Sequence, residues 1–99
     1  MIVRYTETAA DEIEQIFSYI AERNPAAARN VRARIEQTTG ALTSFPYMAQ
    51  MSDEPGVRVT PVGRFPYLIF YHVEKDEIVI LHVRHSARQR PWEQPRVDD

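Results

Sequence analysis

The dipeptide Asn24-Pro25 separates two amphipathic segments, and it constrains the fold more than any other feature of the sequence. Pro25 disfavours helical backbone at the residue before it, so a helix that begins at Thr6 or Thr8 must end near Arg23. The same dipeptide is also a start signal, because Asn favours the N-cap and Pro favours the first helical position. With about two residues between them, the two predicted helices fold back as an antiparallel hairpin.

Residues at helical spacing occur on both sides of this dipeptide. In the first segment, i, i+3, i+4 and i+7 positions are filled by Ile13, Ile16, Phe17 and Ile20. The second segment has residues spaced alternately by three and four positions, as in a coiled-coil seam. They are Ala28, Val31, Ile35, Thr38, Leu42 and Phe45. Pro46 follows and ends the second helix.

Four other runs are rich in β-branched and aromatic residues and are typical of strands. They span residues 2–5, 57–62, 67–73 and 77–85. Residues 47–56 contain Pro55 and Gly56 without periodicity, which indicates a loop. The order β-α-α-β-β-β predicts an α+β fold in which a helical hairpin packs on one face of an antiparallel sheet. Residues 78–81 are apolar on both faces, so we expect a partner to cover the second face or the groove beside the hairpin.

The length of 99 residues predicts one domain, residues 1–99, of which residues 86–99 form an irregular tail. The absence of cysteine excludes disulfides, thiolate metal sites and thiol catalysis. No apolar run approaches the roughly 18 residues that a membrane span needs, and the N-terminus does not resemble a signal peptide. We therefore expect a cytoplasmic protein, without a metal site, because no spacing of His, Asp or Glu resembles one, and without a cofactor.

Eleven of the twelve basic residues are arginine, and several of them follow the last predicted strand. Arginine binds phosphate and carboxylate groups with two parallel hydrogen bonds. We expect a basic cluster where the sheet ends, on which Arg58 of a preceding strand and Arg64 of the turn before Phe65-Pro66 converge if the strands are adjacent. Its members are Arg84, His85, Arg88 and Arg90.

This cluster allows three interpretations. A histidine beside fixed positive charges can serve as the acid or base of phosphodiester cleavage, and the candidate catalytic residues are then Arg58, Arg64, Arg84, His85 and Arg88. The cluster can instead bind a macromolecular target without catalysis, through Arg84, His85, Arg88, Arg90 and Trp92. In the third interpretation, these side chains only satisfy backbone carbonyls at the strand end. We expect His72 and His82 to be sheet residues with structural partners, and His82 and Arg84 to share a face with Ile78 and Ile80.

The order of several motifs resembles the RelE/ParE superfamily of toxins from bacterial type II toxin–antitoxin systems, close to its plasmid-stabilisation branch. The resemblance covers about residues 2–92. The matching segments include Tyr5-Thr6-Glu7-Thr8-Ala9, Phe45-Pro46, Phe65-Pro66-Tyr67-Leu68-Ile69-Phe70-Tyr71 and Ile80-Leu81-His82-Val83-Arg84-His85-Ser86-Ala87-Arg88.

The resemblance implies a cognate antitoxin of the ParD or RelB kind, a hetero-oligomeric complex and growth inhibition. ParE-like members inhibit DNA gyrase, whereas RelE-like members cut mRNA in the ribosomal A site. Leu68 stands where the ribonuclease branch commonly has an arginine, and Trp92 rather than a tyrosine follows Arg88. These departures favour a ParE-like gyrase inhibitor that is not an enzyme. A RelE-like mRNA endonuclease is the alternative, and a non-toxic member that only binds its antitoxin is the third hypothesis.

Overall fold

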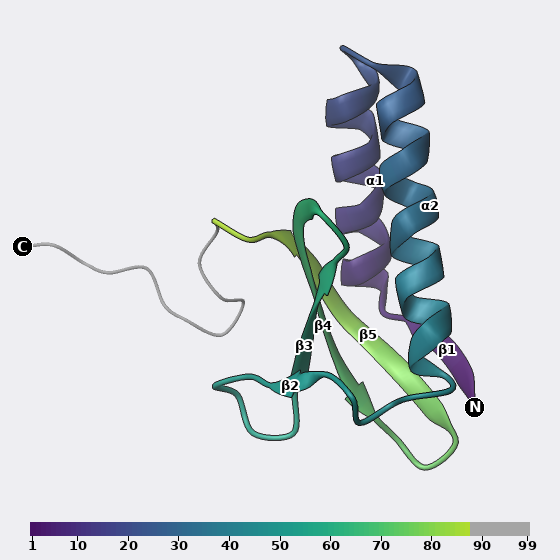
Figure 1. Cartoon of the computed structure of the whole chain (residues 1–99), viewed down its shortest axis with the longest axis vertical. Helices are drawn as coiled ribbons and strands as arrows, with labels where there is room; N and C mark the ends of the chain where they lie inside the picture. The colour runs from purple at the N-terminus through teal and green to yellow at the C-terminus, as the bar shows by residue number, and fades with distance from the viewer. Residues whose placement is uncertain (88–99) are drawn as a thin grey trace, which may run out of the picture.

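The helical hairpin lies where the capping residues predict it in the computed structural model, which describes residues 1–87 (Figure 1). Helix α1 (Glu7–Ala21) begins after Thr6, whose hydroxyl accepts a hydrogen bond of 3.0 Å from the N–H of Ala9. Helix α2 (Pro25–Leu42) begins after Asn24, whose side-chain oxygen accepts one of 3.0 Å from the N–H of Ala27. Both caps satisfy N–H groups that have no partner within the helix.

The buried stripe of α2 differs from the predicted seam at two positions. Thr39 is buried at 2% exposure, whereas the hydroxyl of Thr38 donates to the carbonyl of Arg34 at 2.7 Å. Phe45 lies beyond the end of the helix and is 59% exposed. A straight helix has 3.6 residues per turn, so a strict alternation of three and four drifts off the buried face after several turns. The buried positions are Ala28, Val31, Ile35, Thr39 and Leu42.

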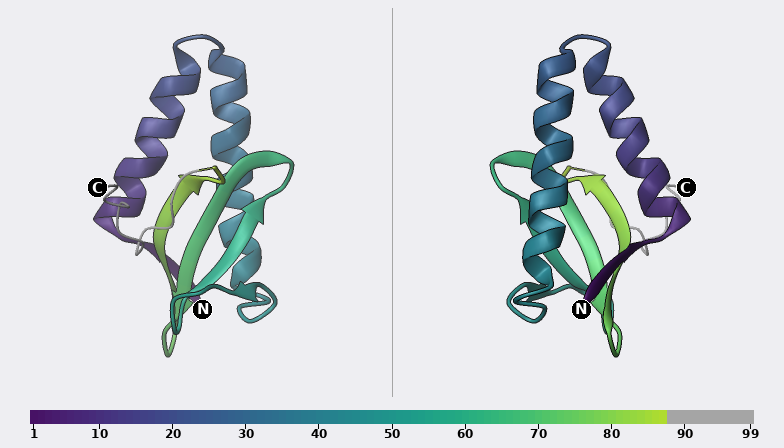
Figure 2. Two further views of the ribbon diagram at one scale, coloured as in Figure 1. Left: turned by 90° about the vertical axis from the view of Figure 1, so that its left-hand side faces the viewer. Right: turned by 90° about the vertical axis from the view of Figure 1, so that its right-hand side faces the viewer.

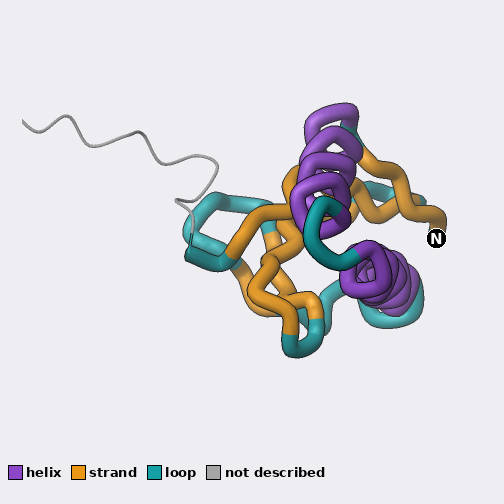
Figure 3. Tube along the Cα trace, turned by 90° about the horizontal axis from the view of Figure 1, so that it is seen from above, coloured by secondary structure: helices purple, strands orange, loops and turns teal. Residues whose placement is uncertain are grey.

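A five-stranded sheet lies beside the hairpin, and both helices cover the same face of it (Figures 2 and 3). The strands are β1 (Ile2–Tyr5), β2 (Gln50–Met51), β3 (Arg58–Val62), β4 (Phe65–Val73) and β5 (Glu77–His85). Their order in the sheet is β1-β5-β4-β3-β2. The predicted α+β fold is therefore confirmed, and the predicted loop contains the short additional strand β2.

The sheet is mixed, whereas the sequence predicted an antiparallel one. Strands β2 to β5 pair in antiparallel fashion, but β1 runs parallel to β5, with Ile2 opposite Glu77 and Tyr5 opposite Ile80. Parallel neighbours need a long crossover connection, which the helices and the remaining strands provide here. The direction of β1 depends on a partner about 75 residues away, and no local pattern specifies it.

A β-bulge interrupts the pairing of β4 with β5. Phe70 pairs with His82 and Tyr71 pairs with Ile80, so Leu81 is an extra residue on β5. An extra residue in a strand shifts all following side chains to the opposite face of the sheet.

The bulge overturns the predicted face of His82 and Arg84. Ile78 and Ile80 belong to the core beneath the helices. After the bulge, Val83 belongs to this core, and His82 and Arg84 do not. The interpretation that His82 and Arg84 share the face of Ile78 and Ile80 is therefore wrong. Strict alternation fails because one residue of β5 has no counterpart on β4.

The second face of the central strands is also largely buried. Val79 and Phe70 are each 2% exposed, and Val57 is 8% exposed. The expectation that this face stays open for a partner is wrong at these positions. The large exposed apolar side chains lie instead at Tyr19 of α1, at the start of β1 and in the connection between α2 and β3, at Phe45, Tyr47, Met48 and Met51.

The cap of α2 can be tested by substitution. Replacing Asn24 by Ala leaves the N–H of Ala27 without its partner, so we expect the free energy of unfolding to fall by about 1 kcal/mol. Asn24→Asp keeps an acceptor at the same position and should stay close to the parent protein. Urea denaturation of the three proteins measures the difference, and equal midpoints would show that the cap does not stabilise the hairpin.

Candidate functional site

A groove of about 460 Å³ lies between α1 and the end of β5. It forms because β1 pairs with β5 only as far as Ile80, after which the chain turns into α1 and leaves the edge of β5 facing the helix. Its lining comes from α1 through Glu12, Gln15, Ile16 and Tyr19, from β4 through Tyr67, and from β5 through Val83, Arg84 and His85. The structure thus brings the predicted residues Arg84 and His85 to one groove.

The carboxylate of Glu12 connects α1 to the edge of β5. One oxygen accepts a hydrogen bond of 3.0 Å from the backbone N–H of Val83, and the other accepts one of 2.9 Å from Nε of Arg84. The ring nitrogen Nδ1 of His82 lies 3.2 Å from the same carboxylate. Glu12 therefore takes the place that another residue of β1 would have occupied along the strand edge, and it satisfies two side chains as well.

This contact gives Arg84 and His82 structural partners. The side chains of Glu12 and Arg84 are only 13% and 23% exposed, so their ion pair is partly desolvated. Sequence reasoning missed this role of Glu12. No local signal could have revealed it, because the partners lie about 70 positions further along the chain.

The other wall of the groove is aromatic. The rings of Tyr67 and His85 meet edge to face, with centroids 5.6 Å apart and an interplanar angle of 82°. Nδ1 of His85 accepts from the N–H of Ala87 at 3.1 Å, which leaves Nε2 to carry the proton of the neutral ring. Burial raises the pKa of the Tyr67 hydroxyl, and Tyr19 raises it further, so Tyr67 stays neutral at physiological pH. Tyr19 itself is 66% exposed at the rim.

Arg58 lies away from this groove. It pairs with Tyr71 on β4, near the opposite end of the sheet from His85, which pairs with Tyr67. Its guanidinium donates to the carbonyl of Ala49 at 2.8 Å and to that of Tyr47 at 3.2 Å, and it lies over the Tyr47 ring. Arg58 thus holds the connection between α2 and β3 rather than converging on the predicted cluster.

The remaining predicted residues are distributed as follows. Arg64 lies in the turn between β3 and β4, where it lines a separate pocket. His72 has a structural partner, as predicted for both sheet histidines, because its Nε2 lies 3.3 Å from Glu74. The predicted positions Arg88, Arg90 and Trp92, and most of the predicted irregular tail, lie outside the described residues.

Within residues 1–87, no group of three or more His, Asp or Glu side chains could hold a metal ion. Neither α1 nor α2 combines the length and the hydropathy that a membrane-spanning helix requires.

The match to a known family covers almost all of this architecture. The family model described as the ParE toxin of the type II toxin–antitoxin system parDE matches residues 3–90. The chain belongs to this ParE toxin family. Membership implies an antitoxin partner, as the sequence motifs predicted.

Individual relatives agree with this assignment. The chain is 32% identical over 89 residues to the Sinorhizobium fredii protein named "Putative toxin Y4kP", covering 90% of this chain and 92% of the relative. It is 27% identical over 86 residues to toxin RelE2 of Caulobacter vibrioides, covering 87% and 96%. A chain from the chromosomal ParDE toxin–antitoxin system of P. aeruginosa has the same fold, with a TM-score of 0.77 and 24% identity, over 86% of this chain and 95% of that one.

The contact made by Glu12 predicts a large effect on stability. Glu12→Ala leaves Arg84 and the N–H of Val83 without their acceptor in a partly buried site, and we expect the free energy of unfolding to fall by about 2 kcal/mol. Glu14→Ala is the matched control, because Glu14 also pairs from α1 with an arginine, Arg32, but its side chain is 60% exposed.

The control should change the free energy of unfolding by less than about 1 kcal/mol, as is usual for exposed ion pairs. Chemical denaturation of both variants gives the comparison. Equal losses would mean that Glu12 stabilises the protein no more than an ordinary surface charge does.

Proposed function

We propose that this ParE-family toxin inhibits DNA gyrase by binding to it and that a cognate antitoxin neutralises it by occupying the groove between α1 and β5. The observation that carries the gyrase part is the use of the basic side chains. Arg84 pairs with Glu12, Arg58 binds two loop carbonyls, and Leu68 stands opposite Arg84 on β4. Among residues 1–87, this disperses the charges that phosphodiester cleavage would need around one phosphate.

The groove supports the antitoxin part of the proposal. Ile16 and Tyr19 of α1 form its apolar wall, and the wall from β4 and β5 combines the Tyr67 ring with the polar groups of Arg84 and His85. A side chain as large as Tyr19 that stays two-thirds exposed at a groove rim offers apolar area to a partner, and aromatic residues of this kind often dominate binding energy. An antitoxin segment with apolar and acidic side chains would match both walls.

For the contact with the target, we propose His85 together with Arg88, Arg90 and Trp92, which follow it in the sequence. His85 is exposed at the end of β5, and its ring is held by Tyr67 and by the N–H of Ala87. Arginine and tryptophan are enriched among the residues that contribute most to protein interfaces.

A RelE-like mRNA endonuclease is the second candidate. Similarity to toxin RelE2 favours it, as does the contact between Tyr67 and His85, which places two groups capable of proton transfer side by side. Against it stands the pairing of Arg84 with Glu12.

Two assays with the purified protein separate these candidates. We expect the protein to block ATP-dependent supercoiling of relaxed plasmid by gyrase, and to leave mRNA intact on translating ribosomes. His85→Ala, Arg90→Ala and Trp92→Ala should each weaken gyrase inhibition, whereas Arg29→Ala, an exposed arginine of α2, should not.

Each alternative result has a distinct meaning. Cleavage of mRNA that stops in His85→Ala would replace the gyrase proposal by the endonuclease. A protein that arrests neither growth nor gyrase, yet binds the product of a neighbouring reading frame, would be the non-toxic member of the family.

The antitoxin groove is tested by a substitution at its rim. Tyr19→Ser removes exposed apolar area without disturbing the core, so we expect at least tenfold weaker binding of the antitoxin and unchanged thermal stability. Met48→Ser is the control, because Met48 is 73% exposed but lies outside the groove. Isothermal titration calorimetry measures both affinities, and equal losses for the two variants would place the antitoxin elsewhere.

A further inference from the structure

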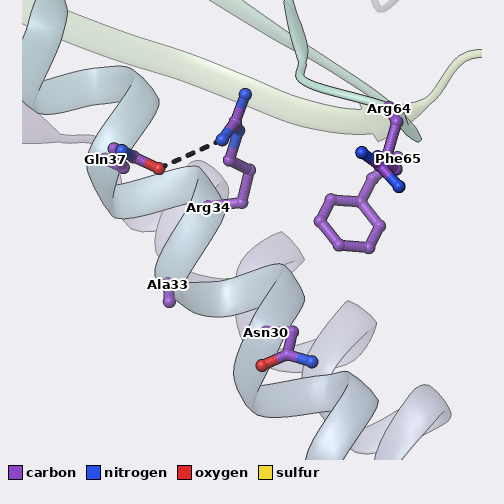
Figure 4. Close-up of a pocket in the computed structure, with 6 residues that line it drawn as sticks. All are labelled: Asn30, Ala33, Arg34, Gln37, Arg64 and Phe65. Carbon is purple, nitrogen blue, oxygen red and sulfur yellow. Dashed lines mark hydrogen bonds between the residues drawn. The ribbon is translucent and has the colours of Figure 1, made fainter.

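A second pocket, of about 420 Å³, lies between α2 and the turn that joins β3 to β4 (Figure 4). Two arginines from distant parts of the chain, Arg34 of α2 and Arg64 of the turn, line it together. The rest of the lining is Asn30, Ala33, Gln37 and Phe65. Guanidinium and amide groups supply hydrogen-bond donors, so the pocket presents mainly donors and positive charge.

Gly63 lets Arg34 approach this turn. Its φ of +55° is in the left-handed region, and a Cβ there would lie 2.6 Å from Nε of Arg34. Only a residue without a side chain leaves room for the guanidinium at this distance. The guanidinium of Arg34 therefore lies against the residue that directly precedes Arg64, and Nη1 is oriented by a 3.3 Å hydrogen bond to Gln37.

Neither charge is compensated within the described part of the chain. Arg34 bonds to the neutral side chain of Gln37, and no carboxylate of residues 1–87 pairs with Arg34 or Arg64. None of the described residues that line the pocket is acidic. By contrast, Arg4, Arg32 and Arg84 each pair with a glutamate. Two neighbouring like charges without a counter-ion favour the binding of an anion.

We propose that Arg34 and Arg64 together bind the carboxylate of an acidic side chain of the antitoxin, an inference that rests on the antitoxin part of the proposed function. Planar guanidinium groups pair with carboxylates through two parallel hydrogen bonds, and two such groups at one pocket fix the position of one acidic residue. The pocket therefore selects the register of the bound segment.

The position of the pocket favours a protein partner over a nucleic acid. Phe65 lines this pocket and Tyr67, two residues further along β4, lines the groove, so two residues of one strand, roughly 7 Å apart, contribute to the two sites. One extended segment can cross from the groove to the pocket. The net charge of −2 and the pI near 5.9 lack the overall positive charge that a nucleic-acid-binding domain shows.

The full-length protein can be titrated with the peptide acetyl-Glu-Asp-Glu-amide, following the Nε–H signals of arginine by NMR. We expect the signals of Arg34 and Arg64 to shift, and Arg34→Gln or Arg64→Gln to weaken binding about tenfold. Arg29→Gln, which removes the same charge from the same helix outside the pocket, should have no effect. The neutral peptide acetyl-Gln-Asn-Gln-amide should not bind.

Gly63→Asn tests the geometry without removing a charge. Asparagine tolerates a positive φ, but its Cβ displaces the guanidinium of Arg34, so the same loss of peptide binding is expected while the protein stays folded. Unchanged peptide binding in this variant would overturn the inference, because binding would then not depend on where the Arg34 guanidinium lies.

Two further results would overturn it. The first is the absence of any shift at Arg34 and Arg64 at millimolar acidic peptide, and the second is preferential binding of a deoxythymidine decamer to these arginines. Either failure is distinguishable from failure of the proposed function. If an antitoxin neutralises the Arg34→Gln and Arg64→Gln variants as well as the parent protein, only the inference about the pocket is wrong. If the protein binds the peptide but does not inhibit gyrase, only the gyrase part of the proposed function is wrong.

Discussion

The carboxylate of Glu12 joins the helical hairpin to the stretch of β5 that β1 does not reach. Its bonds to the N–H of Val83 and to Arg84 satisfy a strand edge that would otherwise expose unpaired donors beneath α1. The groove exists because β1 ends where it does: a β1 two residues longer would fill the space that Tyr19 and His85 now line. A single acidic side chain thus replaces part of a strand, and a groove lies where that strand would have continued.

Much of the fold could be predicted from the sequence, since its signals are local. Asn24-Pro25 defines the hairpin, and the apolar periodicity of α1 and α2 defines the face that packs on the sheet. The direction of β1, the bulge at Leu81 and the partner of Glu12 could not be predicted. Each of these depends on residues that meet only after the chain has folded, and single-sequence patterns contain no information on such pairs.

The candidate site was predicted less well for the same reason. Residue type identified the arginines, but their roles depend on what lies beside them: Arg58 holds a loop, Arg84 pairs with Glu12, and Arg64 lines a pocket with Arg34, which sequence reasoning did not single out. The signal that could have found Arg34 is Gly63, because a glycine before an arginine in a tight turn indicates a close approach by another group. Arg84 and Arg58 are held by partners within the chain, whereas no carboxylate of residues 1–87 pairs with Arg34 or Arg64, and this difference is the reason we propose the latter two as binding residues.

The parallel pairing of β1 with β5 joins the beginning of the described chain to nearly its end. Strand β1 leaves the ribosome early, but its partner, residues 77–80, is synthesised about 75 residues later. The hairpin of α1 and α2 can form during translation, whereas the sheet cannot close until almost all of the described chain has been made. A ParE-family toxin built in this way has no complete groove while it is still a nascent chain, so interrupted synthesis yields fragments that lack the assembled surface.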